Sequence, residues 1–232
     1  LGVLRRKGHE ISEEEELAVC VGILLHDIGH GPFSHALEHS ITRNIPHESI
    51  SLLFMEELNR QFDGQLDLAI EIFKGNYKRK FLHQLISSQL DMDRLDYLRR
   101  DSFYTGVSEG RINAERLLTM LNVVDDELVV DAKGIYSVEK FIIARRLMYW
   151  QVYLHKTVLS AEFLLMMILK RARELHANGV RIHGSSSLLA FLGQAVERSD
   201  FQADPQWLYR FSRLDDYDIL GSIKEWCHHD DE

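Results

Sequence analysis

The sequence has few of the residues that interrupt helices or cross-link secreted domains: three prolines and two cysteines in 232 residues. Two cysteines are too few for a disulfide framework. Cys20 lies inside an apolar run, where we expect a buried thiol. The scarcity of cysteine favours a reducing compartment, so we expect a cytoplasmic protein.

The sequence also lacks long apolar runs and an excess of basic residues. Its longest apolar run, "FLLMMIL" at 163–169, is far shorter than the roughly 18 residues that a membrane span requires, so we expect no membrane insertion. The formal net charge of −9 argues against stable nucleic-acid binding, which depends on Lys and Arg at phosphates. The negative net charge is still compatible with a small phosphorylated substrate, because a bound metal and a few arginines can make one pocket positive.

Apolar residues at intervals of three and four predict an almost wholly helical protein. Ser12 and Glu15 form a capping box that opens a first helix, which should end at the glycine and proline stretch after residue 28. Further helices are expected on "SHALEHS", from near Pro46, and over about 65–74 and 79–90. The segments "DMDRLDYLRRD" and "NAERLLTMLNV" continue the helical pattern.

The C-terminal half contains the exceptions to this pattern. In "ELVVDAKGIY", β-branched residues flank a turn at Asp131 and Gly134, which predicts a small β-hairpin near 127–136. A periodic segment from about 138 to 177 predicts one long helix. We therefore expect an all-α helical bundle with one hairpin. No linker is visible, so we expect a single unit over 1–232, with core motifs in 1–160 and a helical extension in 161–232.

The stretch "HDIGHGPFSH" at 26–35 concentrates ionisable residues where the first helix should end. His26 and Asp27 are adjacent, so they would point about 100° apart on a regular helix. At a last helical turn the backbone can bend enough for both to reach one cation, and imidazole plus carboxylate suits Mn, Fe or Zn. His30 and His35 add imidazoles that could stabilise phosphate charge or transfer protons. A capped helix end is the alternative for the His-Asp pair alone.

Two further patterns place polar residues on one helical face. Asp93, Tyr97 and Asp101 follow one another at intervals of four residues, as expected for ligands of a metal and a sugar hydroxyl, or for a solvated stripe. A second row of polar residues lies within "ARRLMYWQVYLHKT". It fits either a triphosphate-binding pocket or the solvent-exposed face of a helix. Its members are Arg145, Tyr149, Tyr153 and Lys156.

Long motifs in this chain closely resemble the HD-domain phosphohydrolases, in particular their deoxynucleoside triphosphate triphosphohydrolase branch. They are "LLHDIGHGPFSHALE", "PHES", "LDMDRLDYLRRDSFYTGV", "GRINAERLL" and "YLHK", in the family's order over roughly residues 1–160. The resemblance implies an all-helical HD domain with a divalent metal held by two histidines and two aspartates. His26, Asp27 and Asp93 match three of these ligands. The first histidine would stand two positions before Leu1, and Mn, Fe, Zn, Mg and Ni are not distinguished.

The resemblance also implies roles for other residues. His47 in "PHES" matches a proton donor or phosphate ligand, and we group it with His30 and Glu48 as catalytic. Tyr149 departs from a histidine expected in vertebrate relatives, so base and sugar preference stay open. The matched substrate-binding residues are His35, Arg94, Tyr97, Asp101, Arg145, Tyr153 and Lys156.

The resulting expectation is a metal-dependent hydrolase that converts deoxynucleoside triphosphates to nucleoside and triphosphate. The resemblance implies a homo-oligomer and allows an allosteric nucleotide at subunit contacts. Two alternatives stay open: an HD-type phosphatase or phosphodiesterase acting on another nucleotide, and a nucleotide-binding regulatory module. Histidines outside the motifs, such as His9 and His83, are expected to face solvent or to form local hydrogen bonds.

Overall fold

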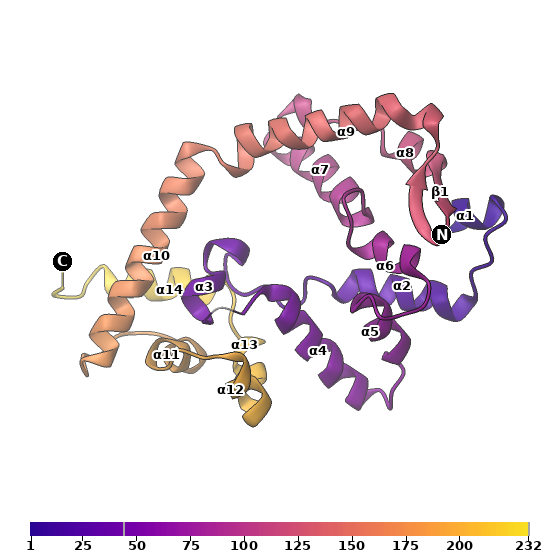
Figure 1. Ribbon diagram of the computed structural model, residues 1–232. Helices are drawn as coiled ribbons and strands as arrows, with labels where there is room; N and C mark the ends of the chain where they lie inside the picture. The colour runs from indigo at the N-terminus through magenta and orange to yellow at the C-terminus, as the bar shows by residue number, and fades with distance from the viewer. Residues whose placement is uncertain (44, 232) are drawn as a thin grey trace. The chain divides into compact units, whose positions relative to one another are not determined.

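The computed structural model describes residues 1–43 and 45–231, and it divides into two compact units (Figure 1). Unit 1 comprises Leu1–His26 and Met55–Val158, and unit 2 comprises Asp27–Phe54 and Leu159–Glu232. The chain therefore passes between the units three times. The expectation of a single unit with a helical extension stays a prediction.

Unit 1 contains most of the helices before residue 149 and the hairpin. Its elements are α1 (Gly2–Arg6), α2 (Glu13–Leu25), α5 (Asp67–Phe73), α6 (Lys80–Ile86), α7 (Met92–Thr105), α8 (Ala114–Met120), β1 (Leu121–Val124), β2 (Glu127–Val130) and α9 (Ile135–Met148), with 3₁₀ turns at Ser108–Gly110 and Ala132–Gly134 and a π-helical turn at Tyr149–Tyr153.

Unit 2 contains the turn after α2 and the C-terminal helices. Its elements are a 3₁₀ turn (Ser34–Ala36), α3 (Glu38–Ile41), α11 (Ser186–Gly193), α12 (Arg198–Ala203), α13 (Gln206–Phe211) and α14 (Asp216–Trp226). Two long helices, α4 (His47–Gln61) and α10 (Lys156–Ala177), have residues in both units.

The predicted first helix is α2, which positions the end of the HD motif. The Ser12 side chain accepts from the Glu15 backbone N–H while the Glu15 side chain accepts from the Ser12 N–H, so the predicted capping box is confirmed. Within unit 1, α2 packs on α5 and α6 (Figure 1). A Cβ on Gly22 would lie 2.6 Å from the Ile86 side chain, so glycine permits this close packing.

Each unit has its own apolar core. In unit 1, α7, α8 and α9 meet through a cluster that includes the buried residues Leu98, Leu117 and Met148. In unit 2, the core joins the segment after the HD motif to the C-terminal helices. Its buried members include Leu37, Ile41, Ile50, Leu188, Phe191, Val196, Phe211 and Ile219.

The all-α fold with one small hairpin is confirmed, with differences in detail. The two strands pair antiparallel at 121–124 and 127–130. Their two-residue turn is Asp125-Asp126, both with positive φ (51° and 63°), and the expected turn at Asp131 and Gly134 is instead a 3₁₀ turn that leads into α9. The predicted helix on "SHALEHS" is reduced to a 3₁₀ turn and the short α3.

Two other expectations were wrong. The segment 138–177 is not one helix, because a π-helical turn at Tyr149–Tyr153 ends α9 and α10 starts at Lys156. Its predicted C-terminal stop is correct, since α10 ends at Ala177 and Gly179 adopts φ 78°. Cys20 is exposed, because it lies on the face of α2 opposite the buried Ala18 and Gly22.

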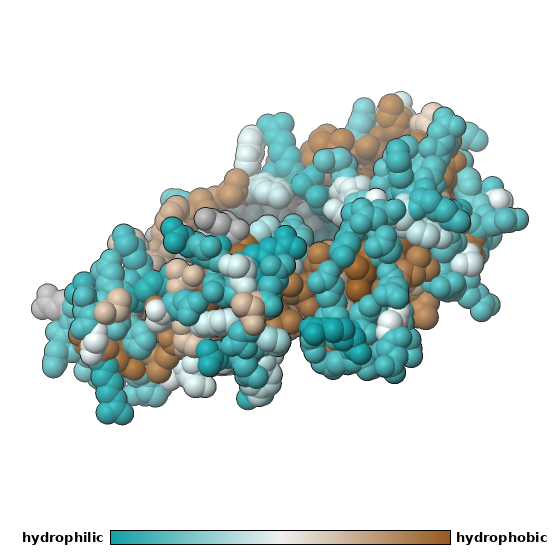
Figure 2. Space-filling model, turned by 60° about the horizontal axis from the view of Figure 1, so that its bottom comes forward, coloured by the Kyte–Doolittle hydropathy of each residue, from teal (hydrophilic) through white to brown (hydrophobic). Residues whose placement is uncertain are grey.

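The surface in Figure 2 is largely hydrophilic (teal), with apolar patches (brown) between the polar side chains. Among the described residues, no single helix has the length and apolar character needed to cross a membrane. One bent pair of helices in the described part of the chain, Ala132–Tyr153 with Lys156–Ala177, meets those criteria jointly, by length and composition.

Candidate functional site

His26 and Asp93, 67 positions apart in the chain, face each other in unit 1. His26 follows the last residue of α2, and Asp93 lies in the first turn of α7. The His26 Nε2 atom is 3.7 Å from Asp93 Oδ1. The nearby His26 imidazole lowers the pKa of Asp93, although partial burial acts in the opposite direction. The Asp93 carboxylate is therefore ionised at neutral pH.

Local hydrogen bonds orient the His26 side chain and set the start of α7. His26 Nδ1 is 2.6 Å from the Ile23 carbonyl oxygen, so Nδ1 donates and Nε2 is the nitrogen directed at Asp93. The start of α7 is set by buried Asp91, whose carboxylate accepts from the Ser88 and Arg94 backbone N–H groups at 2.9 and 2.8 Å. An imidazole oriented by a backbone carbonyl is the usual arrangement of a metal-binding histidine.

The donor set fits a divalent cation. Asp27 is the next residue after His26 and the first of unit 2, and its Oδ1 is 3.7 Å from His30 Nε2. One imidazole and two carboxylates suit Mn, Fe, Zn and similar metals better than they suit a soft thiolate-binding ion. Three candidate ligands for such an ion, His26, Asp27 and Asp93, are present in this chain.

In unit 2, a tight turn follows the HD pair and places the next histidines. A Cβ on Gly29 would lie 2.3 Å from the His47 carbonyl oxygen and 2.3 Å from the Ser51 backbone nitrogen, so only glycine fits. The Gly29 N–H donates to Ser51 Oγ at 2.9 Å. This close approach brings the turn against the start of α4.

His30, His35 and His47 form a compact cluster in unit 2. The rings of His30 and His47 stack with centroids 4.0 Å apart, and the His35 ring lies edge-on to both at 4.8 and 5.0 Å. Burial lowers the pKa of His30, and the neighbouring His47 lowers it further. His30 is therefore neutral near pH 7, with one ring N–H that it can donate. The structure thus brings together three of the predicted histidines.

Glu38 is a member of this cluster that the sequence analysis missed. Its Oε1 accepts from the His47 backbone N–H at 2.6 Å and lies 3.0 Å from His47 Nδ1, while its Oε2 is 3.3 Å from His35 Nδ1. Burial alone would raise the pKa of Glu38, but these hydrogen bonds lower it to about 2. The available signal was the spacing of Glu38 three residues after His35 on "SHALE". Glu48, predicted as catalytic, is a more exposed neighbour, 3.5 Å from His47 Nε2.

A second group of predicted residues gathers in unit 1, between α7 and the end of α9. The Tyr153 hydroxyl donates to Asp101 Oδ2 at 2.5 Å. The rings of Tyr97 and Tyr153 are 6.2 Å apart, and the Arg145 guanidinium lies 5.7 Å from the centre of the Tyr149 ring. Burial raises the pKa of Tyr153, and the Asp101 carboxylate raises it further, so the phenol remains protonated.

Two other predicted phosphate ligands are Lys156 and Arg94. Lys156 is exposed at the start of α10. Arg94 is 3.4 Å from Asp91 and lines a cavity of about 610 Å³ together with His83, Gln84 and the hairpin strand β2. A role for either residue at a substrate phosphate stays a prediction.

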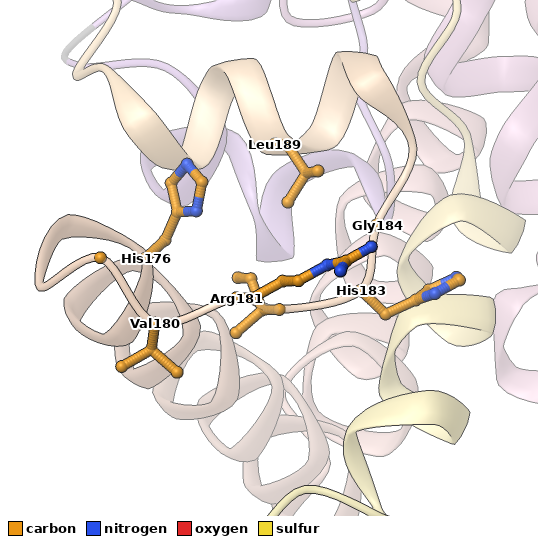
Figure 3. Close-up of a pocket in the computed structure, with 8 residues that line it drawn as sticks. His176, Val180, Arg181, His183, Gly184 and Leu189 are labelled. Carbon is orange, nitrogen blue, oxygen red and sulfur yellow. The ribbon is translucent and has the colours of Figure 1, made fainter.

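Two of the histidines expected to be structural, His9 and His83, form hydrogen bonds. His9 Nε2 is 2.7 Å from Asn122 Oδ1, and His83 Nδ1 is 2.9 Å from the Ile72 carbonyl oxygen. His176 and His183 line a cavity of about 570 Å³ in unit 2, together with Arg181 and Leu189 (Figure 3). This cavity lies at the loop between α10 and α11 and includes none of the predicted site residues.

Comparisons with known proteins identify relatives of this chain. Residues 112–183 match the family model described as the HD associated region. A phosphohydrolase crystal structure from Bacteroides thetaiotaomicron superimposes with a TM-score of 0.96 at 54% identity, over 99% of this chain and 57% of that one. YwfO of Bacillus subtilis is 40% identical over 181 residues, which cover 75% of this chain and 41% of YwfO.

A relative with a named activity is the deoxynucleoside triphosphate triphosphohydrolase SAMHD1 homolog of Dictyostelium discoideum. It is 30% identical over 173 residues, 67% of this chain and 34% of that protein. The chain spans between about a third and three fifths of the length of these relatives. The HD motif, the opposed His26 and Asp93, and these similarities together place the chain in the HD-domain phosphohydrolase superfamily, where it resembles the deoxynucleoside triphosphate triphosphohydrolase branch.

Proposed function

We propose that this protein hydrolyses deoxynucleoside triphosphates to the nucleoside and inorganic triphosphate, using a divalent metal. The observation that carries the proposal is the opposition of the His26 imidazole and the Asp93 carboxylate at 3.7 Å, since it forms the core of a metal site. The named activity of the Dictyostelium relative supports the choice of substrate.

In unit 1, the proposal assigns metal binding and sugar recognition. His26 and Asp93 hold the cation with Asp27. A bound divalent cation supplies an activated water and polarises a phosphoryl oxygen. Tyr97, Asp101 and Tyr153 offer the hydroxyl and carboxylate groups that recognise a sugar hydroxyl.

The positively charged side chains offset the charge that develops on the phosphates. Arg145 is the best placed, because it lies beside Tyr97 and Tyr149 in the sugar-binding group. Arg94 and Lys156 complete the set proposed from the family resemblance. The reaction adds the oxygen of water to the α-phosphorus and breaks its bond to the sugar O5′, which requires a proton.

In unit 2, the proposal assigns that proton to the histidine cluster. His47 or His30 donates it to the leaving O5′, and His35 contacts the phosphates. Glu38 holds His47 through Nδ1, so His47 Nε2 is the nitrogen that can exchange a proton with substrate. The Glu48 Oε1 atom lies 3.5 Å from His47 Nε2, on the side of the ring proposed to face the substrate.

The remaining proposals concern the setting of the protein. A homo-oligomer, an allosteric nucleotide, a cytoplasmic location and the absence of stable nucleic-acid binding are carried over from the sequence and from the family resemblance. Mn, Fe, Zn, Mg and Ni are all candidate metals.

The test is an analysis of reaction products from a panel of deoxynucleoside triphosphates, with each divalent metal supplied in turn. Nucleoside and inorganic triphosphate in equal amounts are expected. Release of orthophosphate would instead indicate a phosphatase acting on another nucleotide. Tight nucleotide binding without turnover in the full-length protein would indicate a regulatory module. Either result would refute the proposed reaction.

A further inference from the structure

The segment between His30 and His35 has a backbone conformation that its residues do not favour. Phe33 and Ser34 adopt φ angles of 54° and 47°, in the left-handed region. Residues with a Cβ rarely adopt this conformation, and two in succession require support from surrounding structure. Phe33 and Ser34 lie between His30 and His35 in the chain. Their backbone conformation therefore sets how the two histidine side chains are oriented relative to each other.

The support comes from the C-terminal part of unit 2. The Phe33 N–H donates to Asp216 Oδ1 at 2.7 Å. A Cβ on Gly31 would lie 3.1 Å from the buried Phe211 ring, so the turn also packs closely on α13. No other hydrogen bond to the Phe33 N–H is found among the described residues.

Asp216 lies at the start of a capped helix. It is the first residue of α14, whose N-cap Asp215 accepts from the Tyr217 and Asp218 backbone N–H groups. The helix is fixed in the unit 2 core through Ile219, which is fully buried. The Asp216 backbone is therefore anchored to that core, while its side chain is exposed.

A second C-terminal residue fixes the other end of the same segment. Arg173 of α10 donates to the Ser40 carbonyl oxygen at 2.6 Å and to the Phe191 carbonyl oxygen at 3.1 Å. Ser40 lies two residues after Glu38, which binds His35 and His47. The segment that carries His30, His35 and Glu38 is thus tied to the C-terminal helices on both sides.

We propose that Asp216 is a positioning residue for the histidine cluster: by accepting from the Phe33 N–H it holds the left-handed turn that sets the placement of His30 and His35. This inference rests on the proposed function, in which these histidines act on the substrate. It gives residues 205–226, which contain none of the predicted catalytic groups, a defined part in the reaction.

The test compares two substitutions that differ in one property. Asp216→Asn retains an oxygen acceptor for the Phe33 N–H, whereas Asp216→Ala removes it. We expect Asp216→Ala to lower kcat about tenfold, with KM little changed, because a misplaced catalytic group affects the chemical step. Asp216→Asn should keep kcat within about twofold of the wild type. Glu225→Ala, at the other end of α14, is the control for loss of an acidic side chain.

A rescue experiment separates positioning from a general effect on α14. Adding Ser34→Gly to Asp216→Ala should restore most of the lost kcat, because glycine adopts the left-handed conformation without support. Loss of kcat in proportion to loss of thermal stability, without rescue, would overturn the proposal. Equal kcat values for the alanine and asparagine variants would also overturn it.

A measurement independent of turnover distinguishes failure of this inference from failure of the proposed function. In NMR spectra of protein labelled at histidine, the ring signals of His30 and His35 should shift in Asp216→Ala and remain in place in Asp216→Asn. The signal of His9, in unit 1, serves as the internal control. Unchanged His30 and His35 signals would refute the positioning role even if the wild-type protein hydrolysed none of the nucleotides tested.

Discussion

At the scale of single residues, Asp93 is the most informative position. Asp93→Ala should lower turnover at least about a hundredfold, because the loss of even an indirect metal partner costs 10–100-fold. Asp96→Ala is a matched control on the same helix, since Asp96 forms an exposed ion pair with Arg100. Steady-state kinetics and circular dichroism of both variants measure the effect. Comparable losses in the two variants would show that the effect comes from the helix and not from the carboxylate.

The lowered pKa of the Glu38 carboxyl group predicts that the stability of the fold depends on pH. Its pKa is lowered to about 2 from an ordinary value of 4.5, so its ionised form stabilises the fold above about pH 4.5. This contribution is lost as the pH falls from about 4.5 toward 2. Glu38→Gln should therefore lower the unfolding free energy by about 2 kcal/mol at pH 7 and by much less near pH 3. Denaturant unfolding at both pH values tests this, and an equal loss at each would contradict it.

The sequence identified most members of the candidate site, because histidines and aspartates concentrate in recognisable motifs. Glu38 escaped notice because a glutamate in a short helix resembles a solvated residue until its hydrogen bonds to His35 and His47 are known. Arg94 illustrates the converse, since its place in a family motif did not predict that it lines the cavity beside the hairpin.

At the scale of elements, the turn after α2 depends on one glycine. A Cβ on Gly29 would lie 2.3 Å from backbone atoms of α4, which cannot move aside easily. Gly29→Ala should destabilise the protein by about 3 kcal/mol, as overpacking does at its upper range. Gly221→Ala, in the interior of α14, meets nothing within 4 Å and should instead stabilise by about 0.5–1 kcal/mol. Thermal unfolding of the pair tests the prediction, and similar shifts of the same sign would contradict it.

Element boundaries were harder to predict than element types. Apolar periodicity continues through Tyr149–Tyr153, so it gave no indication of the π-helical turn that ends α9. The hairpin was placed several residues late because Gly134 is the more familiar turn residue. The actual turn uses Asp125 and Asp126, and aspartate tolerates the left-handed conformation better than most residues.

At the scale of the whole molecule, metal binding should be linked to stability. A ligand at about one hundred times its Kd adds about 2.7 kcal/mol to the unfolding free energy when it binds only the folded state. Adding a divalent metal to chelator-treated protein should therefore raise Tm, and Asp93→Ala should abolish the increase. The Asp96→Ala control should retain it. A Tm increase that persists without the Asp93 carboxylate would place the metal elsewhere.

The central claim is that His26 and Asp93 bind one cation. The most direct measurement is anomalous diffraction from crystals of the full-length protein grown with Mn²⁺. The account predicts an anomalous peak about 2.0–2.3 Å from both His26 Nε2 and an Asp93 carboxylate oxygen. A peak at the histidine cluster of His30, His35 and His47 alone, or an ordered site without a peak between His26 and Asp93, would contradict it.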